Sequence, residues 1–157
     1  MSLHRQLLQR AADKNPIRVG LIGAGKFGSM YLAQVPRTPG VHLVAIADLK
    51  PAIAKKNLAR VGWKPEQSAA PNAQAALRDS NTWITDDWQA LVKLPEIDIV
   101  VECTGSPVQA VDHILAAIAE RKHVVNVTVE ADAFCGPLLA RRAAEARVIW
   151  PTATSRR

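Results

Sequence analysis

Short apolar runs alternate along this chain with segments that have helical spacing. Residues 17–22, 41–48, 97–105 and 123–129 are rich in Val, Ile and Leu on both faces of an extended strand. Amphipathic segments lie between them, bounded by prolines, glycines and N-cap residues. Strands that are apolar on both faces belong to a parallel sheet with helices on both sides. The sequence therefore predicts an α/β fold with a doubly wound, mainly parallel sheet of Rossmann type.

The length of 157 residues suits one domain of this kind. We expect an N-terminal helix within 1–15, a nucleotide-binding domain at 16–150 and a tail at 151–157. Residues 63–82 contain two prolines and many small polar side chains, so they predict an excursion on the surface of the domain. Strand-like pattern resumes at 83–85, and a last strand is expected at 147–150.

The string "GAGKFG" at 23–28 has the spacing G-x-G-x-x-G between a predicted strand and a predicted helix. In such a loop Gly23 permits the tight turn, Gly25 lets the backbone approach a pyrophosphate, and Gly28 allows the helix to pack on the strand. The start of the helix, at Lys26 and Phe27, offers free N–H groups and the positive end of the helix dipole. These residues form the predicted phosphate site.

Asp48 ends the second predicted strand, 20 residues after Gly28. A carboxylate there can bond both ribose hydroxyls of an adenosine and disfavours a 2′-phosphate, which favours NAD(H). Lys50 lies two residues on and could receive the phosphate of NADP(H), so both cofactors stay open. A simple turn or capping aspartate is the alternative for Asp48.

Polar residues also follow the two last long strands. Thr104 and Gly105 end the strand that lies beside the first one in a doubly wound sheet, so we expect them near the nicotinamide ribose. Asn126, Thr128 and Glu130 alternate along the next strand, which predicts that they share one side. Glu130 could then reach a nicotinamide or a substrate, unless it simply begins the following helix.

Other classes of site find little support in the sequence. Cys103 and Cys135 lie in apolar surroundings without metal-ligand spacing and are expected to be buried thiols in a reducing compartment. No metal site or catalytic triad is recognisable, and every histidine is expected to be a surface or strand-end residue: His4, His42, His113 and His123.

Charge and hydropathy point away from nucleic acid and membranes. The net charge is +6, but the basic residues are scattered and no aromatic residues are interleaved with them. No apolar run approaches the roughly 18 residues of a membrane span. The N-terminus has helical spacing and lacks the continuous apolar core of a signal peptide. We expect a cytoplasmic protein.

Taken together, "NPIRVGLIGAGKFG", "IDIVVECTGSP" and "KHVVNVTVEAD…GPLLARRAAEA" resemble the NAD-binding domain of homoserine-dehydrogenase-like oxidoreductases. Within these the chain is most similar to the branch of 1-deoxy-D-xylulose 5-phosphate reductoisomerase-like proteins, which often carry a C-terminal SAF domain. The resemblance covers about residues 3–149. It implies NAD(P)H-dependent hydride transfer with a small polar, possibly phosphorylated, substrate. It also implies that Thr104, Gly105 and Glu130 match contacts of the family.

The chain departs from this family in two places. Homoserine dehydrogenases have a lysine-containing block where this chain reads "VEADAF", which argues against homoserine as the substrate. Family members are more than twice as long, and the catalytic and dimerising half has no counterpart here. Alone, the chain is expected to bind cofactor without turnover. A homo-oligomer, a stand-alone nucleotide sensor and an S-adenosylmethionine-dependent methyltransferase stay open.

The tail "PTATSRR" is polar and basic. Relatives in this branch continue here with Tyr-Gly-Asp-Gln-Pro-Ala, and one codon choice for Pro151 to Arg157 encodes that string in a shifted frame. We therefore expect that a frameshift near Trp150 truncated the protein; a natural short protein with its own tail is the alternative.

Overall fold

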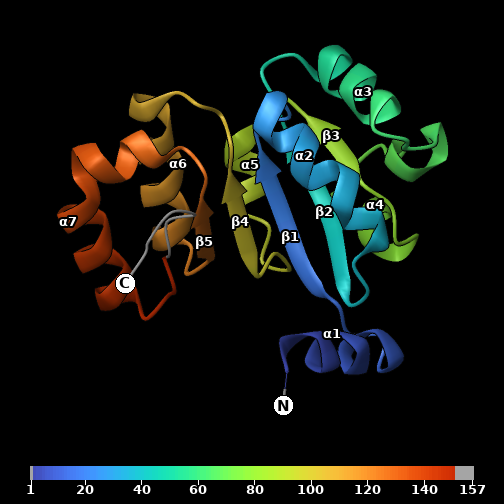
Figure 1. The fold of residues 1–157 in the computed structure, drawn as a ribbon, viewed down its shortest axis with the longest axis horizontal. Coiled ribbons are helices and arrows are strands. Elements are labelled where there is room, and N and C mark those ends of the chain that lie inside the picture. Colours follow the sequence, from blue (N-terminus) through green and yellow to red (C-terminus); the bar gives the residue numbers. More distant parts are fainter. Residues whose placement is uncertain (1, 151–157) are drawn as a thin grey trace.

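A five-stranded parallel sheet forms the centre of the computed structural model, which describes residues 2–150 (Figure 1). The strands are β1 (Ile17–Ile22), β2 (Val41–Ala47), β3 (Trp83–Thr85), β4 (Ile99–Glu102) and β5 (His123–Asn126). Their order across the sheet is β3-β2-β1-β4-β5, and each pairing is parallel. The order switches direction between β1 and β4, which is where such sheets bind ligands. The predicted doubly wound α/β fold is confirmed.

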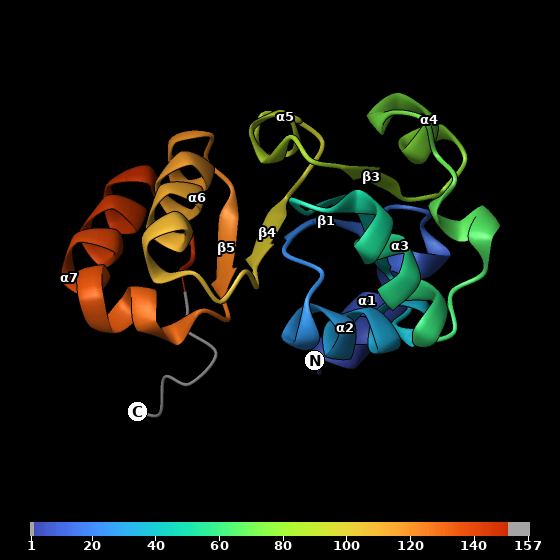
Figure 2. The ribbon, with the colours of Figure 1, turned by 90° about the horizontal axis from the view of Figure 1, so that it is seen from above.

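Helices cover both faces of the sheet (Figure 2). The α-helices are α1 (Leu3–Ala12), α2 (Lys26–Gln34), α3 (Pro51–Arg60), α4 (Ala73–Arg78), α5 (Trp88–Val92), α6 (Pro107–Ala119) and α7 (Val129–Ala146), and the 3-10 helices are Val35–Arg37 and Pro65–Ser68. One buried cluster joins α2 and α3 to the sheet through Leu32 and Leu58. The other buried cluster joins α4, α5, α6 and α7 to the opposite face of the sheet, and Ile114 and Leu139 are fully buried within it. Each face therefore has its own core.

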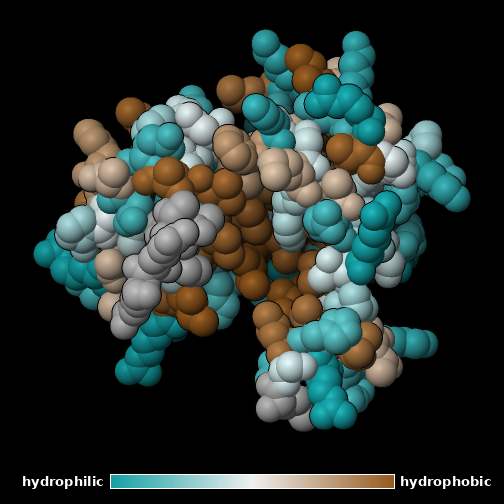
Figure 3. All heavy atoms as spheres, in the orientation of Figure 1, coloured by the Kyte–Doolittle hydropathy of each residue, from teal (hydrophilic) through white to brown (hydrophobic). Residues whose placement is uncertain are grey.

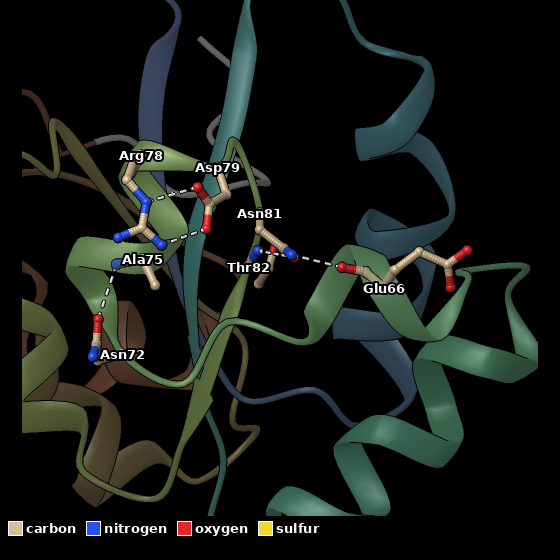
Figure 4. A network of polar contacts seen from close by, with 7 residues as sticks. All are labelled: Glu66, Asn72, Ala75, Arg78, Asp79, Asn81 and Thr82. Atoms are coloured by element: carbon tan, nitrogen blue, oxygen red, sulfur yellow. Dashed lines mark hydrogen bonds and ion pairs between the residues drawn. The ribbon is translucent and has the colours of Figure 1, made fainter.

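The predicted excursion at 63–82 is tied to α2 and β2 by buried polar contacts. The Trp63 indole N–H donates to the Leu32 carbonyl at 2.8 Å, and the Thr82 hydroxyl donates to the Leu43 carbonyl at 2.6 Å. Figure 4 shows the Asn81 side-chain amide donating to the Glu66 carbonyl, which holds the start of the excursion to its end. The segment thus forms part of the domain's packing beside β2 and β3.

The strands end earlier than the sequence predicts. β4 stops at Glu102 and β5 at Asn126, because the chain turns at both places to begin a helix. The strand predicted at 147–150 is wrong, because these residues have no strand assignment. Ile149 makes two contacts beside β5: its carbonyl accepts from the Val124 N–H at 2.9 Å, and its N–H donates to His123 Nδ1 at 3.0 Å. The predicted tail at 151–157 lies outside the described residues.

Within the described part of the chain, no helix covers one part of the sheet. Next to α1 and α2, β4 and β5 line an open groove of about 530 Å³, which we call the apolar groove. Figure 3 shows hydrophobic side chains gathered there in the middle of the molecule. Phe27 and Met30 of α2 lie at this groove and are 61% and 64% exposed. Among residues 2–150, no helix is long and apolar enough to cross a membrane.

Candidate nucleotide-binding cleft

A cleft of about 440 Å³ opens at the carboxyl ends of β1, β2 and β4. Its lining comes from segments that are far apart in the sequence: Gly23 and Gly25 after β1, Asp48 after β2, Asp86 after β3, Thr104 after β4 and His113 on α6. This is the crevice at the switch point of the sheet, where parallel α/β folds hold nucleotides.

The glycine turn after β1 presents backbone donors. Gly23 has φ +94°, a left-handed conformation that favours glycine. The Gly23 N–H donates to the Ala47 carbonyl, and the Ala24 N–H donates to the Asp48 carboxylate. Within the described residues no acceptor contacts the N–H groups of the following segment, 25–28. Free N–H groups at the start of a helix are the kind of donor that a phosphate oxygen binds.

Each glycine of the motif faces a different neighbour. A Cβ at Gly28 would collide with the Gly23 carbonyl oxygen, which confirms the close packing of α2 on the turn. A Cβ at Gly23 would come within 2.8 Å of the Cys103 carbonyl and the Thr104 N. A Cβ at Gly25 would meet nothing within 4 Å, so the open space beside this residue belongs to the cleft.

The Asp48 carboxylate links the two loops that would hold the adenosine. One oxygen accepts from the Ala24 N–H at 2.8 Å, and the other from the Lys50 N–H at 2.9 Å. The turn contact expected as the alternative is therefore present. Each oxygen keeps a lone pair, so the carboxylate can also accept hydrogen bonds from ribose hydroxyls. Asp48 lines the cleft, and its contact with a ribose stays a prediction.

The loop after β4, residues 103–106, is held from beneath; we call it the β4 loop. The Thr104 N–H and hydroxyl both donate to Glu102 Oε1, at 3.2 and 2.5 Å. The Gly105 N–H donates to the Thr128 hydroxyl at 3.0 Å, and Gly105 has φ +70°. The Ser106 N–H donates to the Thr104 hydroxyl at 3.3 Å. The backbone donors of residues 104–106 are thus all satisfied internally.

A buried carboxylate lies at the base of this loop. Glu102 is fully buried, and its Oε1 lies 3.4 Å from His113 Nδ1. Burial alone would raise the pKa of Glu102, but the hydrogen bonds from His113 and Thr104 oppose it, and the pKa lies below its usual value. Burial, together with the nearby Glu102 charge, raises the pKa of the Cys103 thiol to about 12. Cys103 is therefore an inert thiol at neutral pH.

The predicted site residues fall into three groups. Gly23, Gly25, Asp48 and Thr104 line the cleft. Lys26, Phe27 and Gly28 form the first turn of α2, with the Phe27 side chain in the apolar groove instead of the cleft. Lys50, Gly105 and Glu130 are outside the cleft lining.

The prediction that Glu130 shares one side of a strand with Asn126 and Thr128 is wrong. β5 ends at Asn126, and Glu130 lies in the first turn of α7, where it is exposed. Asn126 and Thr128 are both buried. The helix interrupts the alternation before it reaches Glu130, which is the alternative that the sequence left open.

Two residues of the site were missed from the sequence. His113 was expected at the surface but is 5% exposed, lines the cleft and packs edge-on against Trp88 with ring centroids 4.6 Å apart. Glu102 was not singled out at all. The signal that could have found it was a lone acid within the apolar run "IVVEC", because a buried charge needs hydrogen-bond or ion-pair partners.

A glycine turn with free N–H groups, a carboxylate after β2 and a cleft at the switch point define a dinucleotide-binding α/β domain. The family model described as homoserine dehydrogenase, NAD binding domain, matches residues 23–150. The chain belongs to this family of NAD-binding domains, whose cofactor is a nicotinamide dinucleotide. A comparison with curated proteins found no matching sequence.

Solved structures share the fold. A homoserine dehydrogenase from Thiobacillus denitrificans is 25% identical, with a TM-score of 0.68 over 87% of this chain and 29% of that one. A myo-inositol dehydrogenase from Lactobacillus casei, in complex with NAD(H) and myo-inositol, is 16% identical, with a TM-score of 0.66 over 88% and 36%. A biliverdin reductase from Synechocystis with biliverdin and NADP+ is 22% identical, with a TM-score of 0.58 over 87% and 37%. The chain spans about a third of the length of the structures it matches.

Proposed function

We propose that the cleft binds NAD(H) for hydride transfer to or from a small polar substrate. The pyrophosphate would lie on the N–H groups at the start of α2, the adenosine ribose at Asp48, and the nicotinamide half toward Thr104. The observation that carries this proposal is the set of free N–H groups at 25–28, which begins at Gly25 in the same cleft that Asp48 lines. Glu130, which is exposed in α7, is not given a role in it.

The charges at the cleft favour NAD(H) over NADP(H). The lining carries carboxylates at Asp48, Asp86 and Asp112, and none of the lysines and arginines within 2–150 contributes to it. A 2′-phosphate would meet this negative field close to Asp48. Lys50, which the sequence offered as an NADP(H) contact, has an exposed position outside the lining. Both features support the unphosphorylated ribose.

Catalysis is proposed to need residues beyond these 157. The chain spans about a third of the matched oxidoreductases, so most of a substrate site has no counterpart in it. We propose that the chain alone binds cofactor without turnover. The substrate is proposed to differ from homoserine, because "VEADAF" replaces the lysine-containing block that the resemblance would require. A cytoplasmic location and a homo-oligomer remain predictions.

Competition between the two cofactors tests the proposal. The wild-type chain should bind NADH more tightly than NADPH by calorimetry. Asp48→Asn removes the charge at the proposed ribose site. It should weaken the binding of NADH by about tenfold, equivalent to about 1.4 kcal/mol, and reduce the ratio of the affinities for NADH and NADPH. Asp79→Asn, an exposed acid that pairs with Arg78 outside the cleft lining, is the matched control. Tighter binding of NADPH by the wild type would contradict the assignment of NAD(H).

A further inference from the structure

Glu102 occupies a position where the fold alone requires an aliphatic residue. Val100, two residues earlier on the same face of β4, is 1% exposed within the core beneath α6. Glu102 is fully buried beside it, and its Oε2 has no hydrogen-bond partner among the described residues. A buried carboxylate with one unsatisfied oxygen is a poor source of stability. Its presence needs another explanation.

The explanation lies in what Glu102 does to the β4 loop. Its Oε1 accepts hydrogen bonds from both the N–H and the hydroxyl group of Thr104. Because the hydroxyl proton points at Glu102 and one lone pair accepts from Ser106 N–H, the Thr104 oxygen keeps only acceptor capacity. The Gly105 N–H is taken by Thr128. The loop therefore presents hydrogen-bond acceptors to a ligand, and residues 104–106 present no free backbone N–H to it.

The two walls of the cleft are thus chemically opposite. The glycine turn offers free N–H donors, which suit phosphate oxygens. The β4 loop offers acceptors, which suit the ribose hydroxyls and the carboxamide NH₂ of a nicotinamide riboside. A protonated or neutral residue at 102 would free the Thr104 hydroxyl to turn, and the loop would lose this polarity.

We propose that Glu102 is a positioning residue that fixes the β4 loop as the acceptor wall for the nicotinamide half of the cofactor. His113, 3.4 Å from the same Oε1, holds the carboxylate from α6. This inference rests on the proposed function. It adds a role for a residue that touches no cofactor itself and acts through Thr104.

The test compares two ligands that share the adenine half. NADH spans both walls, whereas ADP reaches only the glycine turn and Asp48. In the 157-residue chain, Glu102→Gln replaces the charged acceptor of the Thr104 hydroxyl by a neutral amide. It should weaken the binding of NADH by about tenfold and leave the binding of ADP unchanged within about twofold. Glu145→Gln is the matched control, since this exposed glutamate on α7 lies outside the cleft lining and should change neither affinity.

A second pair of variants keeps the test decisive if Glu102→Gln fails to fold. Thr104→Val removes the hydroxyl at a half-buried loop position and should also weaken NADH selectively, whereas Thr104→Ser retains the hydroxyl and should keep the wild-type ratio of affinities. Equal loss of NADH and ADP with a lowered Tm would assign Glu102 a merely structural role. Unchanged affinity for both ligands would also overturn the inference. If the wild type binds neither ligand, the proposed function itself is wrong.

Discussion

Gly25 and Gly28 belong to one motif, but different neighbours require their lack of a side chain. At Gly28 the neighbour is the backbone of the chain itself, because a Cβ would collide with the Gly23 carbonyl. At Gly25 no protein atom lies within 4 Å of the Cβ position, so only a ligand would require glycine. The fold thus requires glycine at position 28, and the binding of a ligand would require it at position 25.

Alanine at each position separates these two requirements. Gly28→Ala should lower the free energy of unfolding by about 1–3 kcal/mol, because α2 must shift away from the turn. Gly25→Ala should change stability by less than about 1 kcal/mol, as an N-cap substitution, yet weaken NADH by about tenfold or more. Urea unfolding and calorimetry measure the two effects. A Gly25→Ala chain with wild-type affinity would mean that no phosphate lies on this turn.

Single residues also mark where prediction from sequence stops. The glycine spacing and Asp48 could be predicted because a fixed distance along the chain brings them to adjacent strand ends. Glu102 and His113 could not, because their contact joins β4 to α6 and depends on the exact face that α6 buries. The same limit applies to Glu130, whose position depends on where β5 ends.

At the scale of elements, the segment 63–82 shows how polar anchors replace regular structure. Trp63 and Thr82 each donate to a carbonyl, of Leu32 and Leu43, that lies in the packed interior. The sequence predicted an excursion on the surface from its prolines, but it held no periodic signal for these two contacts. Side-chain bonds to distant backbone carbonyls leave no pattern in sequence spacing.

Removing these anchors should destabilise the domain. Trp63→Phe and Thr82→Val each leave a buried carbonyl without its donor, so each should lower the free energy of unfolding by about 1–3 kcal/mol. Thr38→Val is the matched control, because the Thr38 hydroxyl bonds the Gln34 carbonyl at an exposed site and its loss should cost less than about 0.5 kcal/mol. Equal effects of Thr82→Val and Thr38→Val in chemical denaturation would contradict the anchoring role.

At the scale of the whole molecule, the apolar groove is the feature that a folded single domain leaves unexplained. The open face of β4 and β5 and the exposed side chains of Phe27 and Met30 form one hydrophobic surface (Figure 3). Monomeric proteins seldom expose continuous apolar surface of this kind. The sequence predicted the sheet, but the uncovered part of its face follows from which helices pack on which side.

This surface should bind a hydrophobic dye in the native state. The folded chain should enhance the fluorescence of anilinonaphthalene sulfonate, and Phe27→Gln combined with Met30→Gln should reduce that signal while the Tm falls by no more than a few degrees. Val108→Gln changes an exposed apolar residue outside the groove and should leave the signal intact. A folded wild-type chain that gives no dye signal would contradict an open groove.

The central claim is that this cleft holds a nicotinamide dinucleotide. Titrating the 157-residue chain by calorimetry with NADH, NADPH and S-adenosylmethionine tests it most directly. Our account predicts saturable binding of NADH at one site, weaker binding of NADPH and none of S-adenosylmethionine. Binding of S-adenosylmethionine without binding of NADH would contradict it.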